Sequence, residues 1–96
     1  MHDGFGVFIG LDAGKEGHHA VALNRHGKRL HDATLPNTEA GLRKLFDKLA
    51  RHGRILAVVD QPASIGALPV AVARAYGHQV AYLPGLVMRR LADLHP

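Results

Sequence analysis

Two short apolar segments, each carrying a single aspartate, constrain the fold of this chain more than any other feature. The first is VFIGLDAGK (residues 7–15), which contains Asp12, and the second is ILAVVDQP (residues 55–62), which contains Asp60. Near-continuous apolar runs of this length are typical of buried strands in a parallel sheet. A carboxylate in or at the end of a buried strand is costly unless something pairs with it. Since the chain has no cysteine, a hard divalent cation, Mg²⁺ or Mn²⁺, is the shared partner that suits both acids.

The composition predicts one small domain with an aliphatic core. The chain has 96 residues, of which 47% are apolar and 21% charged, with three Phe, two Tyr and no Trp. No apolar run approaches the roughly 20 residues of a membrane span, and the N-terminus does not resemble a signal peptide. We therefore expect a cytoplasmic protein without a membrane partner. The formal net charge of +4 favours a polyanionic partner such as nucleic acid, although a basic domain of this size can equally lack one.

The pattern of apolar runs and turns predicts the element order β-β-β-α-β-α-β-α. Strands are expected over residues 6–13, 18–24, 29–35, 55–59 and 79–83, the third of them at an edge of the sheet. Two hairpins followed by right-handed crossovers imply a mixed sheet in which the first, fourth and fifth strands are parallel. Asp12 and Asp60 would then lie on neighbouring strands at the carboxyl edge, where open α/β sheets place their ligands. Gly14 and Gly17 are expected to supply unusual backbone angles in the first turn.

Three helices are expected. The first begins after an N-cap at Asn37 or Thr38 and ends near Gly53, and it buries the residues Leu42, Leu45, Phe46 and Leu49. The second starts near Gly66 with Pro69 in its first turn, ends at Gly77, and is so apolar that we expect it to be heavily buried. The third covers residues 86–94.

With this order, the chain resembles the ribonuclease H-like fold, and within it the RuvC-like N-terminal domain of the DEDD insertion-sequence transposases. The resemblance is carried by FIGLDAGKEGHHAVALNRHGKRL, VVDQPASIGALPVAVARAYG and VAYLPGLVMRRLADLHP, which together cover nearly the whole chain. It implies metal-dependent cutting and rejoining of DNA, directed by a guide RNA. It also implies that residues 1–96 form an N-terminal domain fragment, truncated before the family's later acids and its serine-bearing C-terminal domain.

The resemblance assigns roles to particular residues. Asp12 matches the first catalytic and metal-binding acid of the family, and Asp60 matches the second, where the family name gives Glu. Two acids alone seldom fix two Mg²⁺ ions, so we expect weak metal binding and no cleavage by this chain alone. Asp93 matches neither of the family's last two acids.

Cationic side chains supply the candidate contacts to nucleic acid. Lys15 follows the first strand and can meet a phosphate, and Arg89 and Arg90 lead toward the position of the later acids; a solvated surface is the alternative for each. The first helix carries a second basic face, formed by Arg43, Lys44, Lys48 and Arg51.

Other polar residues have ordinary structural explanations. His18 and His19 are adjacent in a strand and point to opposite faces, so they cannot chelate one metal together and are interpreted as surface or packing residues. Ser64 is interpreted as a turn or capping residue.

Alternative functions remain open from the residues alone. A Holliday-junction resolvase would use similar acids on the first and fourth strands. A sugar kinase or ATPase of the actin-like fold also has an acid in its first strand, but LDAGKEG lacks the usual Thr or Ser after the glycine. A truncated transposase can also act as a non-catalytic interaction module, and exposed apolar surface would favour a homo-oligomer.

Overall fold

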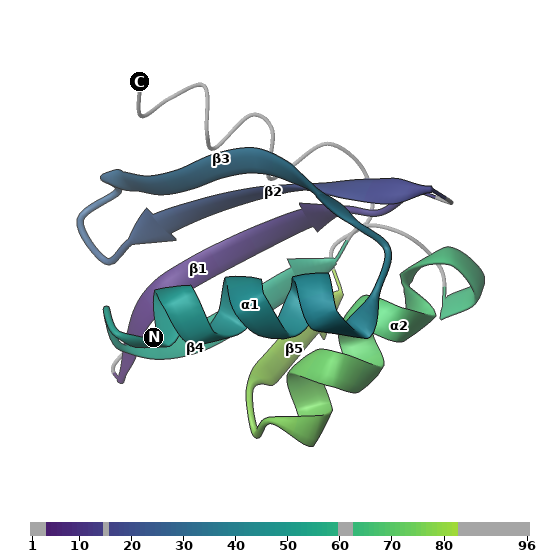
Figure 1. Cartoon of the computed structure of the whole chain (residues 1–96). Helices are drawn as coiled ribbons and strands as arrows, with labels where there is room; N and C mark the ends of the chain where they lie inside the picture. Colours follow the sequence, from purple (N-terminus) through teal and green to yellow (C-terminus); the bar gives the residue numbers. More distant parts are fainter. Residues whose placement is uncertain (1–3, 15, 60–62, 83–96) are drawn as a thin grey trace.

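Two helices pack on one face of a five-stranded mixed sheet in the computed structural model, which describes residues 4–14, 16–59 and 63–82 (Figure 1). The strands are β1 (Phe5–Asp12), β2 (Gly17–Asn24), β3 (Arg29–Pro36), β4 (Arg54–Val59) and β5 (Gln79–Tyr82). The helices are α1 (Glu39–Ala50) and α2 (Ala63–Ala75). All of these elements were expected from the sequence, with bounds that differ by one to three residues.

The strand order in the sheet is β3-β2-β1-β4-β5. β1 pairs antiparallel with β2 and β2 antiparallel with β3, which confirms the two hairpins. β1 runs parallel to β4, and β4 parallel to β5, as right-handed crossovers require. The predicted fold class, a mixed α/β sheet of the ribonuclease H-like type with its third strand at an edge, is confirmed.

Alternation along the strands places the core between the sheet and the helices. Val7, Ile9 and Leu11 of β1 are at most 2% exposed and face the helices. They pack with the apolar side of α1, which consists of Leu42, Leu45, Phe46 and Leu49, as predicted. Among the described residues, the apolar core is aliphatic except for Phe46, in agreement with the composition.

Helix α1 begins at the Thr38 N-cap. The Thr38 hydroxyl accepts a hydrogen bond from the Gly41 amide at 3.1 Å, which satisfies one of the donors left free at a helix start. Glu39 adds a negative charge in the first turn, where the helix dipole favours it. At the other end Arg51 caps the helix, and Gly53 follows with a φ of 134°.

Helix α2 departs from the expectation in two respects. It begins at Ala63, about a turn before Gly66, so Pro69 lies inside the helix and not in its first turn. The expectation of burial on nearly all sides is wrong, because Ala71, Ala75 and Tyr76 are exposed while Pro69, Val72 and Ala73 are buried. Small alanines on the outer side give this helix a high mean hydropathy without a need for burial.

Gly77 ends α2, as predicted, in a Schellman motif. Its φ is 78°, its amide donates to the Arg74 carbonyl at 3.0 Å, and the His78 amide donates to the Ala73 carbonyl at 2.9 Å. The end of the expected fifth strand at Leu83 and the third helix over 86–94 lie outside the described residues. Within the part of the chain that is described, no helix has the length and apolar character needed to cross a membrane.

Candidate functional site

Asp12 is the last residue of β1, at the carboxyl edge of the sheet. The preceding residue, Leu11, pairs in register with Val59, the last residue of the parallel strand β4. The central strands thus end side by side, and Asp12 leaves the sheet beside the point where β4 ends. Asp60 follows Val59 in the sequence and lies outside the described residues.

The expectation that Asp12 is buried within its strand is wrong. Its side chain is exposed, whereas Leu11 before it is 2% exposed. Alternation along β1 places Asp12 on the same side of the sheet as Gly10, opposite the helices. The apolar run buries the body of the strand, and its last residue is exposed, where a carboxylate can bind a hydrated cation.

His18 fixes the turn that follows Asp12. It is 2% exposed, its Nδ1 accepts a hydrogen bond from the Gly14 amide at 3.2 Å, and its Nε2 lies 2.8 Å from Oδ1 of Asn37. Because a backbone amide can only donate, Nδ1 carries the lone pair and Nε2–H donates to Asn37. One imidazole ring therefore ties the β1–β2 turn to the connection between β3 and α1.

Position 14 in this turn requires glycine because there is no room for a side chain. A Cβ atom at Gly14 would lie 2.5 Å from the carbonyl oxygen of Gly17. Neither glycine has a positive φ, so the expected reason, unusual backbone angles, is wrong. Close backbone approach holds the turn tightly against the strand end that carries Asp12.

His19 lies directly across from Asp12 in the β1–β2 pairing. Its Nε2 contacts Oδ1 of Asp32 at 2.5 Å, and Oδ2 of Asp32 accepts a hydrogen bond from Arg29 at 3.2 Å. His19 and Asp32 are 43% and 36% exposed. These contacts hold the His19 ring toward β3, and they confirm that His18 and His19 play separate roles.

The remaining candidate residues fall into two groups. Lys15, Asp60, Arg89 and Arg90 lie outside the described residues. The basic face of α1 is exposed, as expected. Lys48 on that face donates a hydrogen bond to Nδ1 of His31 at 3.1 Å, and Arg43 lies 5.6 Å from the centre of the Tyr76 ring. Ser64 lies in the first turn of α2.

Within the described ranges, no group of three or more His, Asp or Glu side chains is arranged to hold a metal ion. Asp12 is the candidate metal ligand that these ranges contain. The residues that sequence reasoning missed are His18 and Asn37, which are 19 positions apart. Nothing in the sequence pairs them, because their contact depends on the register of three strands.

A mixed sheet of this order, with an acid at the carboxyl end of its central strand, defines a ribonuclease H-like domain. Residues 9–96 match the transposase family named for DEDD acids and the insertion element IS110, and the chain belongs to this family.

Curated relatives agree with this assignment. The 43.6 kDa protein of insertion element IS110 from Streptomyces coelicolor is 61% identical over 95% of this chain and 23% of its own length. The 44.8 kDa protein of IS116 from Streptomyces clavuligerus is 30% identical over 93% of this chain, and the 42 kDa protein of IS900 from Mycobacterium paratuberculosis is 33% identical over 90%. The chain spans 22–23% of the length of these relatives.

Proposed function

We propose that this chain forms the N-terminal part of the catalytic domain of a DNA transposase, in which Asp12 and Asp60 bind a divalent cation for strand cleavage and rejoining. The observation that carries the proposal is the pairing of Leu11 with Val59, which ends β1 and β4 side by side at one edge. Asp12 stands at that edge, and Asp60 is the next residue of the chain after Val59. Membership of the transposase family supports the same chemistry.

The exposed carboxylate of Asp12 is a suitable ligand for Mg²⁺ or Mn²⁺. Both ions take carboxylate oxygens, and Mg²⁺ keeps several of its waters, so an exposed carboxylate can bind an ion that is still largely hydrated. The ion would supply charge neutralisation for the phosphate oxygens during strand transfer. The buried His18 would act on the geometry of this edge, since its bond to Gly14 fixes the turn after Asp12.

The partners that follow from this function are DNA and, from the family resemblance, a guide RNA. Activity would require the remaining acids and the serine-bearing domain of a protein as long as the relatives. We therefore expect residues 1–96 alone to bind metal weakly and to leave DNA uncut.

Metal binding can be tested on the chain itself. Titration with Mn²⁺ should broaden the amide NMR signals of residues at the ends of β1 and β4 before those elsewhere, and Asp12→Asn should abolish this selectivity. Asp47→Asn is the matched control, because Asp47 is an exposed aspartate on α1. Selective broadening that persists in Asp12→Asn would remove Asp12 from the metal site.

Strand cleavage requires the chain extended to the length of its relatives. In that protein Asp12→Asn and Asp60→Asn should each reduce transposition of a marked element at least about a hundredfold, since each removes a metal ligand. Asp47→Asn should transpose normally. Wild-type transposition by Asp12→Asn would refute the catalytic role.

The resolvase and kinase alternatives receive no support from the family match, which is to transposases over residues 9–96. The interaction-module alternative predicts that the extended protein binds its partners equally well with or without Asp12, and the transposition assay separates it from the proposal.

A further inference from the structure

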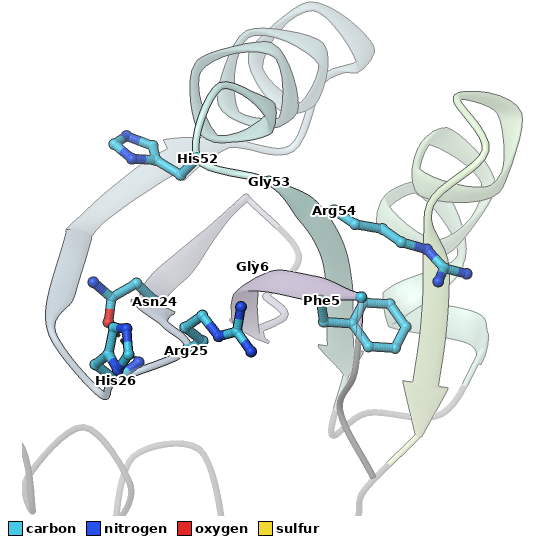
Figure 2. A pocket seen from close by; sticks show the side chains of 9 residues that line it. Phe5, Gly6, Asn24, Arg25, His26, His52, Gly53 and Arg54 are labelled. Carbon is cyan, nitrogen blue, oxygen red and sulfur yellow. Dashed lines mark hydrogen bonds between the residues drawn. The ribbon is translucent and has the colours of Figure 1, made fainter.

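A basic recess lies where β1 begins, at the opposite end of this strand from Asp12. It has a volume of about 390 Å³ and is formed where three separate segments meet: the start of β1, the β2–β3 turn and the α1–β4 turn (Figure 2). Residues 4–6, 24–26 and 52–54 line it. This volume is within the range of about 300–1,000 Å³ usual for ligand sites.

The ionisable side chains in the described lining of the recess are all basic. Arg25 and Arg54 line it together with two histidines, and its described lining contains no acid. Figure 2 shows the Arg25 side chain near Gly6 and the Arg54 side chain on the other side of Phe5. Two arginines in the lining of one recess favour an anion with several phosphate groups, because each guanidinium presents several donors to phosphate oxygens.

Two glycines form the floor of the recess. A Cβ at Gly6 would lie 2.7 Å from the His52 carbonyl oxygen and 3.0 Å from the Gly53 Cα. The start of β1 and the α1–β4 turn therefore cross with backbone against backbone. A side chain at Gly6 would collide with the α1–β4 turn, so this close crossing requires glycine.

The turn that carries Arg25 and the side chain of Arg54 are both ordered by local contacts. Arg25 projects from a turn in which Oδ1 of Asn24 accepts hydrogen bonds from the His26 and Lys28 amides, each at 2.9 Å. The guanidinium of Arg54 lies 4.7 Å from the centre of the Phe5 ring, a cation–π contact that limits its freedom. Charged groups ordered in advance lose less entropy when a ligand binds.

The negative end of the α1 dipole lies at the same edge and would oppose an anion. Its last carbonyls are engaged within the chain, however, because those of Leu49 and Ala50 accept hydrogen bonds from the His52 and Gly53 amides at 3.0 and 3.3 Å. The dipole acts as a partial charge, whereas each arginine carries a full one. The net electrostatic effect of the dipole and the two arginines at the recess therefore favours an anion.

We propose that this recess binds the phosphodiester backbone of a single nucleic-acid strand, as a contact separate from the cation site at Asp12. A recess of this volume accommodates a nucleotide but not the width of a double helix. The shared chemistry is the phosphodiester, so RNA and single-stranded DNA are both candidate sources. This contact would position a strand on the edge of the domain remote from the candidate metal site.

The test compares two variants that each lose two positive charges. Arg25→Gln/Arg54→Gln alters the recess, and the control variant Arg29→Gln/Arg74→Gln alters exposed positions on β3 and α2 that do not line it. Binding of fluorescent 20-nucleotide RNA, single-stranded DNA and duplex DNA is measured by polarisation, with EDTA present so that the metal site plays no part. Salt is varied in each titration, and thermal melts confirm that each variant is folded.

We expect the recess variant to bind single strands about tenfold more weakly at moderate salt and the control variant to change less than about twofold. The slope of log K against log salt should fall by about 1.4 in the recess variant, since each phosphate contact on a single strand contributes about 0.7. Equal loss for RNA and DNA assigns the site to the phosphodiester, and a larger loss for RNA assigns it to RNA.

Equal weakening by the two double variants would overturn the proposal, because it would mean that net charge alone drives binding. Loss confined to the duplex would overturn it as well. If removal of Arg54 from Phe5 unfolds the protein, Arg25→Glu tests the same site alone, since Arg25 stands at the tip of an exposed turn. Unchanged binding of single strands by that variant would refute the inference.

Discussion

The Nε2 atom of His18 lies 2.8 Å from Oδ1 of Asn37, a hydrogen bond that fastens the start of β2 to the connection between β3 and α1. The same ring accepts the Gly14 amide at its other nitrogen. One buried side chain thus joins the turn after Asp12 to the start of the helix that covers the core. The geometry of the candidate site depends on this ring.

His18→Phe should destabilise the chain by about 1–3 kcal/mol. Phenylalanine keeps a ring in the 2% exposed position but leaves the Gly14 amide and the Asn37 oxygen without this partner, and burying polar groups without partners is costly. Urea unfolding measures the change. His26→Phe, on an exposed turn, is the control and should stay within about 0.5 kcal/mol.

A double-mutant cycle isolates the His18–Asn37 contact. The variant His18→Phe/Asn37→Ala should lose less stability than the sum of the two single variants, by about 1 kcal/mol, because the shared bond is counted once. Strict additivity would mean that the two side chains contribute independently.

Alanine at Gly6 and alanine at Gly77 should each destabilise the chain, but for different physical reasons. A Cβ at Gly6 would meet backbone atoms of the α1–β4 turn at 2.7 and 3.0 Å, so Gly6→Ala should cost about 1–3 kcal/mol through displacement of that turn. At Gly77 nothing lies within 4 Å, and the cost of about 1–2 kcal/mol comes from its φ of 78° alone. Thermal unfolding of both variants, with Gly77→Asn, separates the causes.

Asparagine tolerates the left-handed region better than alanine. Gly77→Asn should therefore recover part of the stability that Gly77→Ala loses. If asparagine is no better than alanine at position 77, backbone conformation is not the reason for the glycine.

The sequence predicted the architecture because its signals are local. Alternation and apolar runs defined β1 to β5, and the spacing of Leu42, Leu45, Phe46 and Leu49 defined the buried side of α1. The handedness of crossovers then placed β4 beside β1 without further information. The position of Asp12 at the carboxyl edge follows from the same two steps.

Local sequence patterns did not predict those features that depend on contacts between distant segments or on where a strand ends. The apolar run predicted burial for Asp12, but the strand ends at this residue and its side chain reaches solvent. Nothing in the sequence distinguished His18 from the seven other histidines. Its two hydrogen-bond partners, Gly14 and Asn37, lie in different connections of the chain. The recess with Arg25 and Arg54 arises from residues 4–6, 24–26 and 52–54, three segments that are far apart in the sequence and meet only when the sheet is assembled.

Thr38 should contribute about 1 kcal/mol to stability as the N-cap of α1. Its hydroxyl accepts the Gly41 amide at 3.1 Å, and alanine would leave that donor without the cap. Thr38→Ser keeps a hydroxyl at the same position and should retain most of the stability. Urea unfolding of the two variants side by side tests the cap, and equal losses from alanine and serine would assign the effect to the lost methyl group.

His31 should make the chain less stable in acid. Burial lowers the pKa of His31 below its ordinary value of 6.5, and the nearby Lys48 cation lowers it further, while Asp32 opposes both. Nδ1 of His31 accepts a hydrogen bond from Lys48, and Nε2 is buried without a hydrogen-bond partner among the described residues. Protonation would place a second cation beside Lys48 in a partly buried position.

The sign of the pH dependence follows from the lowered pKa. The unfolded chain takes up the His31 proton near pH 6.5, before the folded chain does, so the full stability is present above that pH and is lost as the pH falls through the folded-state pKa. His31→Gln should therefore flatten part of the decline in unfolding free energy as the pH falls below 6.5. Urea unfolding at several pH values measures it, with His26→Gln as the control.

A residual decline in His31→Gln should come from His78. Its pKa is also lowered, chiefly by burial, with Asp47 opposing, and its ring centre lies 5.2 Å from that of Phe46. Because both histidines shift in the same direction, the double variant His31→Gln/His78→Gln should show a flatter profile than either single variant. A profile unchanged from wild type would mean that carboxylates, and not these histidines, set the acid sensitivity of the fold.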